Sequence, residues 1–592
     1  MSDSKVLTIN PHQDSVLKEW VDITLPDGYL LTEEGVFEER KGGPAMICGP
    51  VWVEALTRDH NGTGWGMVVC WIDRDGRKQS QAISNHRLHE TGGGLAILLA
   101  HGGLMIVPGE ERKVARYLGC FQSKNRVLCV PQVGWVESDN QLVYVRPDRV
   151  ISREETTKIM FQPEQHAPTV DTMKSKGSLD LWQRHVAEPC KGNPYLVFAV
   201  CVSFAAVIQR FAGTDNSGFH LYGNSSRGKT TALQVAASVH GCGADPGGSA
   251  QTYLLRWNTT QNAMEGLAAA HNDGLLILDE IGSCPPYDFG RTVYDLSGGQ
   301  GKSRMTKEAV LHKQRRFRLL ALSSGEYSVR QKIEEAGKQA KAGQMNRFLD
   351  IPIDNAVVVD THGKNAADFV NQLKRECGQC YGTAGPAFIQ AILDEYGKEE
   401  AIRSRIRQYS EEWEELVTQN LSLEPAQSRA LGRLAPVGAA GLMAIELGIL
   451  PFEMADIQHA VETIRDAWLA DELNLSEETR GMYNVRAFIL KHPDRFVSAE
   501  YASERAREVA GYYKNDDKQQ LYLFTPEAFK EACGGIPEKE VARALFGYRL
   551  LHRNNSRHYK SRFLLPGIAQ RLEVYAVKKE ILEGDRLPLS VG

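Results

Sequence analysis

The sequence lacks the cysteine pattern of a zinc site and the long apolar run of a membrane span. Its 11 cysteines are scattered, and the close pair Cys377 and Cys380 has no second pair or histidine cluster at zinc spacing. The longest apolar runs, 95–107 and 195–208, are shorter than the roughly 20 residues that cross a bilayer. Residues 1–5 are polar and unlike a signal peptide. We therefore expect a reduced, cytoplasmic protein with no membrane association.

The sequence also lacks a strong charge of either sign. Its net charge is −5 over 592 residues, and its apolar content of 42% and charged content of 24% are ordinary for a globular protein. A chain of this length is too long for one core and predicts three or four domains. Because there is no global basic field, any contact with nucleic acid must come from local patches.

The clearest motif lies between Gly223 and Thr230, where the phosphate-binding pattern G-x-x-x-x-G-K-[ST] is complete. A short apolar run precedes it and an Ala-rich helical run follows, which is the strand, loop and helix context that this motif requires. The backbone N–H groups of such a loop point at phosphate oxygens, Lys229 reaches the β- and γ-phosphates, and the Thr230 hydroxyl binds Mg²⁺. The predicted ATP-binding residues are Gly223, Asn224, Ser225, Ser226, Arg227, Gly228, Lys229, Thr230 and Thr231.

A second motif, which is acidic, follows the phosphate-binding motif by about fifty residues. The apolar run 275–278 predicts a buried strand of a parallel sheet, and Asp279 and Glu280 follow directly. Ligands of open α/β sheets bind at the carboxyl ends of the strands. We therefore expect Asp279 to hold Mg²⁺ opposite Thr230, and Glu280 to orient and deprotonate the attacking water.

Hydroxyl and guanidinium groups further along suit the same site. Another apolar strand ends in Ser323 and Ser324, either of which suits sensing of the γ-phosphate, and the spacing does not choose between them. Arg347 precedes a third apolar strand and suits contact with a neighbouring subunit's γ-phosphate. Arg429 and Arg433 share one helix face and suit contact with nucleotide from a helical lid, although salt bridges explain them equally well.

Two basic segments are candidates for contact with DNA. Residues 298–318 hold seven Lys or Arg residues and one acid around a Gly-rich tip, which predicts a hairpin. Residues 541–563 hold six Lys or Arg residues, no acids and several aromatic residues, although a solvated hairpin has the same composition. The predicted DNA contacts are Lys302, Arg304, Lys307, Arg549, Arg553, Arg557 and Lys560.

The order of these signals resembles that of AAA+ ATPases. The basic hairpin before the Ser-ending strand resembles superfamily 3 and minichromosome-maintenance helicases. More closely, the chain resembles the domain family of unknown function numbered nine-two-seven, which includes replicative helicases of phages, prophages, satellite islands and staphylococcal cassettes. The resemblance covers roughly residues 25–450 and is carried by residues 177–179, 219–231, 237–241, 272–280, 297–304, 322–326, 342–347 and 381–388.

The resemblance implies that Lys229 and Thr230 of the phosphate-binding motif, together with Asp279 and Glu280 of the acidic motif, carry the ATP and Mg²⁺ chemistry. It makes Ser323 or Ser324 the first sensor, where Asn is commoner, and Arg347 the arginine finger that acts in trans. It makes Arg429 the second sensor, with Arg433 as the alternate. Lys302 and Arg304 fall in the hairpin that lines the pore of a ring.

These observations predict an α/β fold with five parts. Residues 1–155 form a mixed, mostly β accessory domain, 156–176 a linker, 177–364 the AAA+ core, 365–475 a helical lid and 478–592 a winged-helix-like DNA-binding domain. The accessory domain is either a scaffold or a platform for nucleic acid or a partner.

The predicted function is that of an ATP-driven DNA helicase for replication of a mobile element. It would act as a homo-oligomeric ring, expected to be a hexamer, with host or element-encoded replication proteins as further partners. One alternative is an origin-binding initiator that uses ATP as an assembly switch. A protein-remodelling AAA+ ATPase is another.

Overall fold

The computed structural model divides into two compact units, Met1–Arg465 and Asp466–Gly592. The described residues are 23–90, 93–138, 141–154, 159–163, 171–248, 251–302, 314–336, 345–419, 421, 423, 425–473, 477–501, 509–516, 519–553, 558–565, 568 and 570–582.

A parallel five-stranded sheet lies at the centre of the first unit. Its strands run in the order β13-β14-β15-β12-β16, and all neighbours pair in parallel. The central strands are almost wholly apolar, as expected of strands that are buried on both faces. The strand bounds are β12 Ser217–Tyr222, β13 Leu255–Arg256, β14 Gly274–Asp279, β15 Leu319–Gly325 and β16 Phe348–Pro352.

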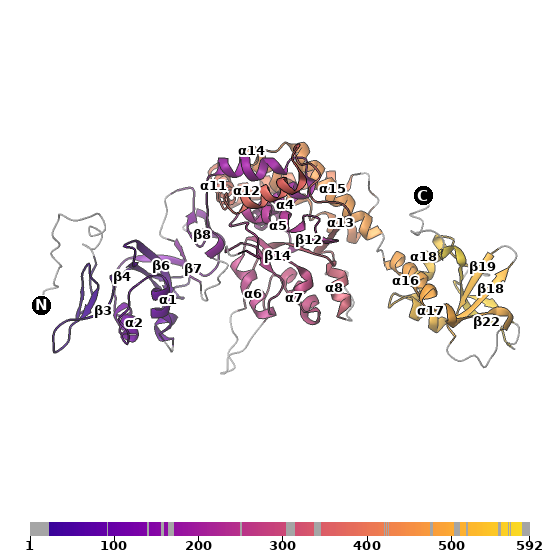
Figure 1. Ribbon diagram of the computed structural model, residues 1–592, viewed down its shortest axis with the longest axis horizontal. Coiled ribbons are helices and arrows are strands. Elements are labelled where there is room, and N and C mark those ends of the chain that lie inside the picture. The colour runs from indigo at the N-terminus through magenta and orange to yellow at the C-terminus, as the bar shows by residue number, and fades with distance from the viewer. Residues whose placement is uncertain are drawn as a thin grey trace. The chain divides into compact units, whose positions relative to one another are not determined.

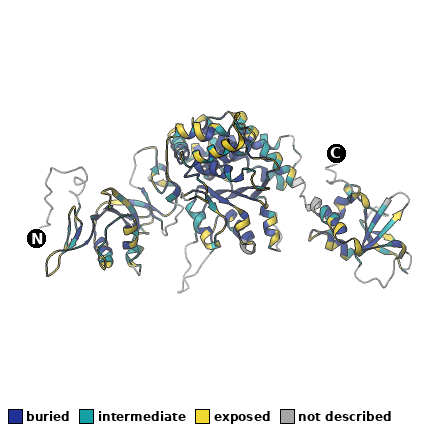
Figure 2. Ribbon diagram, in the orientation of Figure 1, coloured by how far each residue is buried: buried dark blue, intermediate teal, exposed yellow. Residues whose placement is uncertain are grey.

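Helices cover both faces of this sheet (Figure 1). On one face lie α4 (Pro194–Ala212) and α5 (Lys229–Ser238), and on the other lie α6 (Gln261–Ala270), α7 (Pro286–Gly298) and α8 (Val329–Glu335). Burial is concentrated along the sheet and α4 (Figure 2). Among the described residues, α4 alone is long and apolar enough to cross a membrane, but 83% of its most apolar window is buried inside the unit. It is the apolar helix that the sequence predicts over 195–211.

The helices after β16 pack on α4 and α5. Helix α14 lies against α4 and α12, and α10 lies against α5. Gly438 allows the close approach of α14 to α12, because a Cβ there would meet the ring of Trp413. The helical character expected of this region is confirmed. The helices are α10 Ala366–Cys377, α11 Ala384–Tyr396, α12 Glu399–Thr418, α13 Pro425–Leu431, α14 Ala435–Glu446 and α15 Met454–Leu473.

The N-terminal part of the first unit is mostly β, as predicted. Three sheets have the strand orders β1-β2-β3, β10-β9-β8 and β11-β7-β4-β5-β6. The elements are β1 Tyr29–Leu31, β2 Val36–Glu38, β3 Ala45–Cys48, β4 Val51–Arg58, β5 Gly66–Ile72, β6 Lys78–Ser84, α1 Gly94–His101, α2 Glu111–Gly119, β7 Arg126–Val130, β8 Gly134–Ser138, β9 Gln141–Val145, β10 Val150–Ile151 and β11 Ile159–Phe161.

The segment 156–176, expected to be a linker, contributes strand β11 to the N-terminal sheet. Strand β11 pairs in parallel with β7, and Ile159 is buried there. The strand was not predicted because prolines and polar residues surround the apolar triplet 159–161. After the segment, the sequence over 177–182 predicts a helix start capped by Ser178, and this is confirmed, because the Ser178 hydroxyl accepts from the Leu181 N–H at the start of α3 (Leu179–Trp182).

Residues of strands β8 and β9 form hydrogen bonds that link the N-terminal part to the central sheet and to α4. The Trp135 ring N–H donates to Val207 O at 2.8 Å, and its backbone N–H donates to Asp273 Oδ2 at 3.1 Å. The Tyr144 hydroxyl donates to Asp273 O at 2.9 Å, and Arg210 donates to Trp135 O at 2.9 Å. The N-terminal part therefore docks at the end of the sheet where β14 begins.

The second unit has a sheet in the order β17-β18-β19-β22-β20 with helices beside it. The sequence predicts helices over 483–491 and 537–546 and a strand over 519–524 in this unit, and all three are confirmed. It also predicts a hairpin over 548–565, which is wrong, because β20 and β21 do not pair with each other and both pair with β22. The elements are α16 Glu477–Lys491, β17 Phe496–Ser498, β18 Gly511–Asp516, β19 Gln519–Phe524, α17 Pro526–Ala532, α18 Glu538–Gly547, β20 Leu551–His552, β21 Ser561–Phe563 and β22 Leu572–Lys578.

Three buried histidines predict acid sensitivity of the first unit. Burial lowers the pKa of His220, His240 and His271 from 6.5 to about 4. Below pH 6.5 the unfolded chain takes up protons that the folded chain does not, so the free energy of unfolding falls as the pH drops from 6.5 towards 4. The expected loss between pH 7 and 5 is on the order of 1–2 kcal/mol per histidine.

Denaturant unfolding at several pH values measures this loss. His271→Gln should reduce the pH dependence by one histidine's share, whereas the same change at His86, whose side chain is 83% exposed, should not. An equal pH dependence in both variants would contradict the assignment.

Candidate nucleotide-binding site

The carboxyl ends of three neighbouring strands bring the predicted site together. Tyr222, the last residue of β12, is level with Gly325 on β15, and Leu278 on β14 is level with Ser323. Because the strands are parallel, the loops that follow them leave the sheet at the same edge. The phosphate-binding motif, the acidic pair and the Ser-ending strand therefore lie side by side.

The glycines of the phosphate loop are required by backbone conformation and by space. Gly223 and Gly228 have φ of +140° and +89°, in the region that side chains rarely adopt. A Cβ at Gly223 would stand 2.8 Å from Ile353 O, and one at Gly228 would stand 3.2 Å from Val357 Cβ. Helix α5 begins at Lys229, so its free N–H groups open towards the loop.

Lys229 is folded back into the loop that it follows. Its Nζ donates to Gly223 O at 2.8 Å and to Asn224 O at 2.6 Å, and its side chain is buried. Burial lowers the pKa of Lys229. The carboxylates that oppose this change of pKa are, in order of effect, Glu326, Glu280 and Asp279. The ammonium group therefore lies within the field of three carboxylates.

Oxygen atoms suited to Mg²⁺ converge beside the loop. Thr230 Oγ1 lies 3.3 Å from Asp279 Oδ2, and the Ser324 hydroxyl donates to Asp279 Oδ1. Mg²⁺ prefers hard oxygen ligands and is usually held by one or two protein groups together with substrate phosphates. The Thr230 hydroxyl and the Asp279 carboxylate fit that pattern. Among the described residues there is no cluster of three or more His, Cys, Asp or Glu side chains that would hold a metal without a nucleotide.

The pleat of β15 distinguishes the two serines that the sequence leaves open. Successive side chains of a strand point to opposite faces. Ser324 contacts Asp279, whereas Ser323 lies 2.5 Å from His220 Nδ1, and His220 Nε2 lies 2.8 Å from Tyr327 O. Both serines are buried, but only Ser324 faces the acidic pair.

Glu280 is exposed and has an unusual backbone conformation. Its φ of +61° is left-handed, and it begins the short helix Ile281–Ser283. Such conformations cost about 1–3 kcal/mol and concentrate at functional sites. This turn separates Glu280 from the buried Asp279 and gives it access to solvent.

Glu326 is a neighbour of Lys229 that the sequence analysis missed. It follows β15 directly and heads the carboxylates that raise the pKa of Lys229. Its position two residues after Ser324, at the end of a strand next to β12, was the signal that could have found it.

Arg347 and Arg433 lie at the opposite edge of the sheet. The Gly218 N–H, at the start of β12, donates to Arg347 O at 2.8 Å, and Arg433 donates to Asn346 O at 2.6 Å. Strand β12 has six residues and is about 20 Å long, so both lie a strand length from their own phosphate loop. The structure therefore does not bring Arg433 to its own nucleotide site.

The surroundings of these arginines differ. Arg347 Nη2 lies 3.4 Å from Asp215 Oδ2, and the Arg347 side chain is 35% exposed. Burial lowers the pKa of Arg433, which also experiences the charges of Asp215 and Arg347. Arg429 is exposed in the last turn of α13, whereas Arg433 lies in the turn between α13 and α14, so the prediction that they share one helix face is wrong.

The base of the predicted basic hairpin is formed. The Gly301 N–H donates to Arg315 O at 2.8 Å, and the Phe317 N–H donates to Gly299 O at 3.0 Å. Lys302 is tied to α6, because its Nζ donates to Gln261 Oε1. Arg304 and Lys307 lie outside the described residues.

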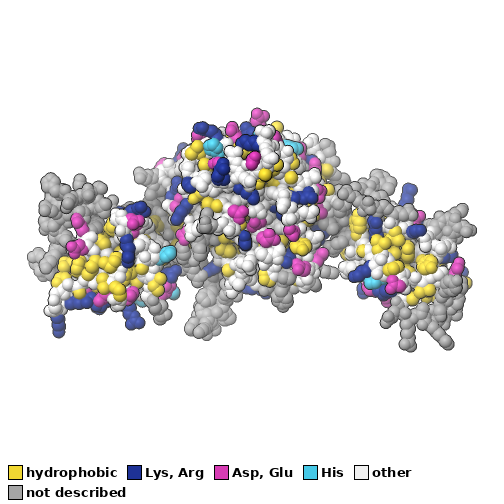
Figure 3. Space-filling view, viewed as in Figure 1, with side chains coloured by type: hydrophobic (Ala, Val, Ile, Leu, Met, Phe, Trp, Pro, Cys, Tyr) yellow, Lys and Arg dark blue, Asp and Glu magenta, His cyan; other side chains and the backbone are white. Residues whose placement is uncertain are grey.

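The second unit holds the other candidate DNA contacts. Arg553 lies over the Phe546 ring at 3.7 Å from the centroid, and Lys560 lies 5.5 Å from that of Tyr575. Arg549 has a left-handed φ of +59° after α18. Arg557 lies outside the described residues. Basic and acidic side chains are interspersed on the surface drawn in Figure 3, in keeping with the small net charge.

One solved structure agrees with this architecture. A solved structure described as "SCCmec type IV Cch - active helicase" matches with a TM-score of 0.65 and 18% identity, over 94% of this chain and 98% of that chain. At this identity the match shows a shared fold. A second structure, "The A form apo structure of NrS-1 C terminal region-CTR", has a TM-score of 0.26 and 9% identity, over 68% of this chain and 89% of that chain.

No curated protein matches the chain in sequence. Residues 30–316 match the family model described as "Domain of unknown function (DUF927)". The predicted resemblance to this family is thereby confirmed over residues 30–316, and the chain shares the fold of a protein described as an active helicase.

Proposed function

We propose that the protein is an ATP-driven DNA helicase of the AAA+ type that serves replication of a phage, prophage or satellite element. The observation that carries the proposal is the convergence of Lys229, Thr230, Asp279, Ser324 and Glu280 at one sheet edge. The shared fold with a protein described as a helicase supports it.

Each of these side chains has a role in hydrolysis of the γ-phosphate. Lys229 exchanges its two carbonyl partners for β- and γ-phosphate oxygens. Thr230 and Asp279 would hold Mg²⁺, which when bound would neutralise developing charge on the phosphates. Glu280 accepts a proton from the water that attacks the γ-phosphorus, and the bond to the ADP oxygen breaks. Ser324 holds the Asp279 carboxylate in place.

The arginines at the far edge support action as a closed ring. Neither Arg347 nor Arg433 reaches its own phosphate loop, and the Arg347 side chain is 35% exposed at the far edge. In a ring with heterologous interfaces, each such edge faces the phosphate loop of the next copy. We infer that both arginines act in trans, so that Arg433, the alternate for the second sensor, would contact nucleotide between subunits and not from a lid within its own subunit.

Two separate basic regions support DNA as the partner. The hairpin that carries Lys302 would follow single-stranded DNA in the pore of a hexamer. The second unit, with helices α16 to α18 beside a sheet and stacked Arg553 and Phe546, would act as a winged-helix-like module on duplex DNA.

Removal of the catalytic groups should separate binding from turnover. Glu280→Gln should retain ATP binding and lower kcat by about 10²–10⁴-fold, because the water loses its base. Lys229→Ala should lose ATP binding as well. Glu400→Gln, an exposed change on α12, is the control. Equilibrium binding of nucleotide, steady-state ATPase and strand unwinding give the readouts, and unwinding at the wild-type rate by both variants would end the proposal.

The two serines should differ in kind. Ser324→Ala should lower kcat by about 10²-fold, because the Asp279 carboxylate loses a donor that positions it. Ser323→Ala should lower the melting temperature, because buried His220 loses its partner, while kcat is preserved. Melting curves and ATPase rates on both variants make the comparison. A larger kcat loss at Ser323 would contradict the orientation of β15.

Complementation tests the trans role of Arg347. Arg347→Ala and Lys229→Ala should each be inactive alone, with the arginine contributing about 10³–10⁵-fold to the rate. Mixed rings should regain ATPase activity, because some interfaces then join an intact Lys229 to an intact Arg347. Mixing Arg347→Ala with Glu280→Gln should rescue in the same way, and Arg375→Ala should be active alone. Mixtures that stay inactive despite assembly, seen by mass measurement, would refute the trans role.

A further inference from the structure

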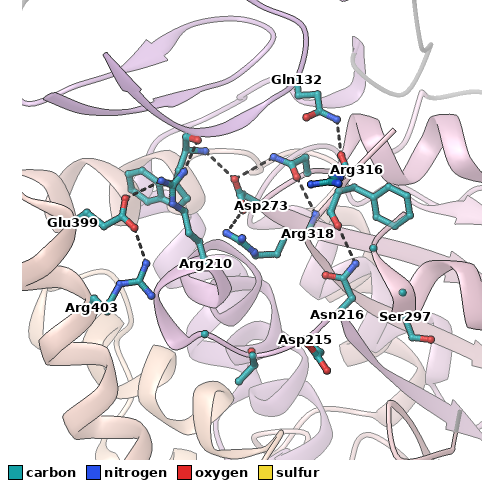
Figure 4. A pocket seen from close by; sticks show the side chains of 17 residues that line it. Gln132, Arg210, Asp215, Asn216, Asp273, Ser297, Arg316, Arg318, Glu399 and Arg403 are labelled. Carbon is teal, nitrogen blue, oxygen red and sulfur yellow. Dashed lines mark hydrogen bonds and ion pairs between the residues drawn. The ribbon is translucent and has the colours of Figure 1, made fainter. Parts of the chain in front are cut away.

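A cavity lies at the base of the basic hairpin and has no part in the nucleotide site. Its volume is about 810 Å³. It is bounded by the two hairpin legs, residues 297–299 and 316–318, by Gln132 and Trp135 of the N-terminal part, and by the loop 213–216 (Figure 4). We call it the hairpin-base cavity.

The hairpin-base cavity lies at the edge of the sheet away from the phosphate loop. Asn216, Asp273 and Arg318 line it, and each directly precedes the strand β12, β14 or β15. Asp279 and Ser324 lie at the other ends of β14 and β15. The cavity is therefore separated from the nucleotide site by the length of the strands.

Four arginines line the hairpin-base cavity, and their pairing leaves positive charge available. Glu399 binds both Arg210, at 2.8 Å, and Arg403, at 2.6 Å, so one carboxylate serves two guanidinium groups. Arg318 Nη1 lies 3.5 Å from Asp273 Oδ1. Arg316 is exposed and has no ion pair among the described residues.

The acidic groups of the cavity are already engaged. Asp273 is buried, and its Oδ2 accepts from the backbone N–H of Trp135. Asp215, on the rim, pairs with Arg347. The lining therefore presents more guanidinium donors than its carboxylates accept, and Figure 4 shows Arg318 and Arg316 on the side of the hairpin legs.

Guanidinium groups suit phosphate in particular, because their paired N–H groups bind it in a bidentate manner. The cavity volume lies within the range of about 300–1,000 Å³ that holds small ligands, which suits one or two nucleotide units. Gly298 has open space where a Cβ would lie, so the sugar-phosphate backbone of a ligand can approach it closely. A duplex, whose major groove alone is about 12 Å wide, is too large for it.

We propose that the hairpin-base cavity binds the phosphates of single-stranded DNA where the strand passes the root of the hairpin. The inference rests on the proposed action on DNA and adds a second contact beyond the hairpin tip. A phosphate on Arg318 competes with Asp273 for the guanidinium group. Arg318 and Asp273 directly precede the strands β15 and β14, whose other ends carry Ser324 and Asp279, so DNA at the cavity acts on the strands that carry the catalytic groups.

Salt-dependent binding of a fluorescent single-stranded oligonucleotide tests the proposal on the full chain. Arg316→Ala should lower the affinity about 3–10-fold near 0.15 M salt and reduce the slope of log K against log[salt] by about one, because one phosphate contact is lost. Arg403→Ala should add to the effect. Arg316 is exposed and unpaired among the described residues, so its loss should leave the melting temperature unchanged. Arg375→Ala, at a side chain of α10 that is 66% exposed, is the matched control and should change neither quantity.

The outcomes separate this inference from the proposed function. An unchanged slope in Arg316→Ala, with a reduced one in Lys302→Ala, would overturn the cavity and leave the helicase proposal standing. Loss of fluorescent ADP binding by Arg316→Ala with DNA binding intact would make the cavity a nucleotide site and also overturn it. Wild-type protein that does not bind single-stranded DNA would overturn both.

Discussion

The common direction of the strands in the central sheet is the constraint on which the rest of the molecule depends. Because β12, β14 and β15 are parallel, everything that follows a strand gathers at one edge and everything that precedes a strand gathers at the other. The first edge holds the phosphate loop and the carboxylates. The second holds Arg347, Arg433 and the hairpin-base cavity. About 20 Å of strand separates two chemically different surfaces.

That separation explains why the proposed motor requires more than one copy. The edge with Lys229 and Asp279 has a cation suited to phosphate and oxygen atoms suited to Mg²⁺. Neither Arg347 nor Arg433 reaches it from the far edge. The far edge is also where the N-terminal part docks, through the hydrogen bonds of Trp135 and Tyr144 to Asp273. The neighbouring subunit, the basic hairpin and the N-terminal part would thus all contact the same ends of the strands. Strands β14 and β15 connect these ends to the nucleotide site.

Local motifs were predictable because their chemistry is contiguous in the chain. The phosphate loop combines its glycines, its lysine and its threonine within eight residues, and the buried strand before Asp279 is a continuous apolar run. The apolar helix α4 followed from its composition in the same way. Features that depend on partners far away in sequence were less accessible. The strand β11 exists because β7 is beside it, and β20 and β21 both pair with β22 rather than with each other.

The succession of a phosphate loop, an acidic strand end and a hydroxyl-bearing strand end can be read from the amino acids alone, since each of these is a property of a few consecutive residues. That Ser324, and not Ser323, contacts Asp279 follows only from the folded sheet, because the pleat sends adjacent side chains to opposite faces. The fold also places Glu326 in the field around Lys229 and Arg433 beside Arg347. These neighbours are set by strand order and helix packing, which no single segment of the chain contains.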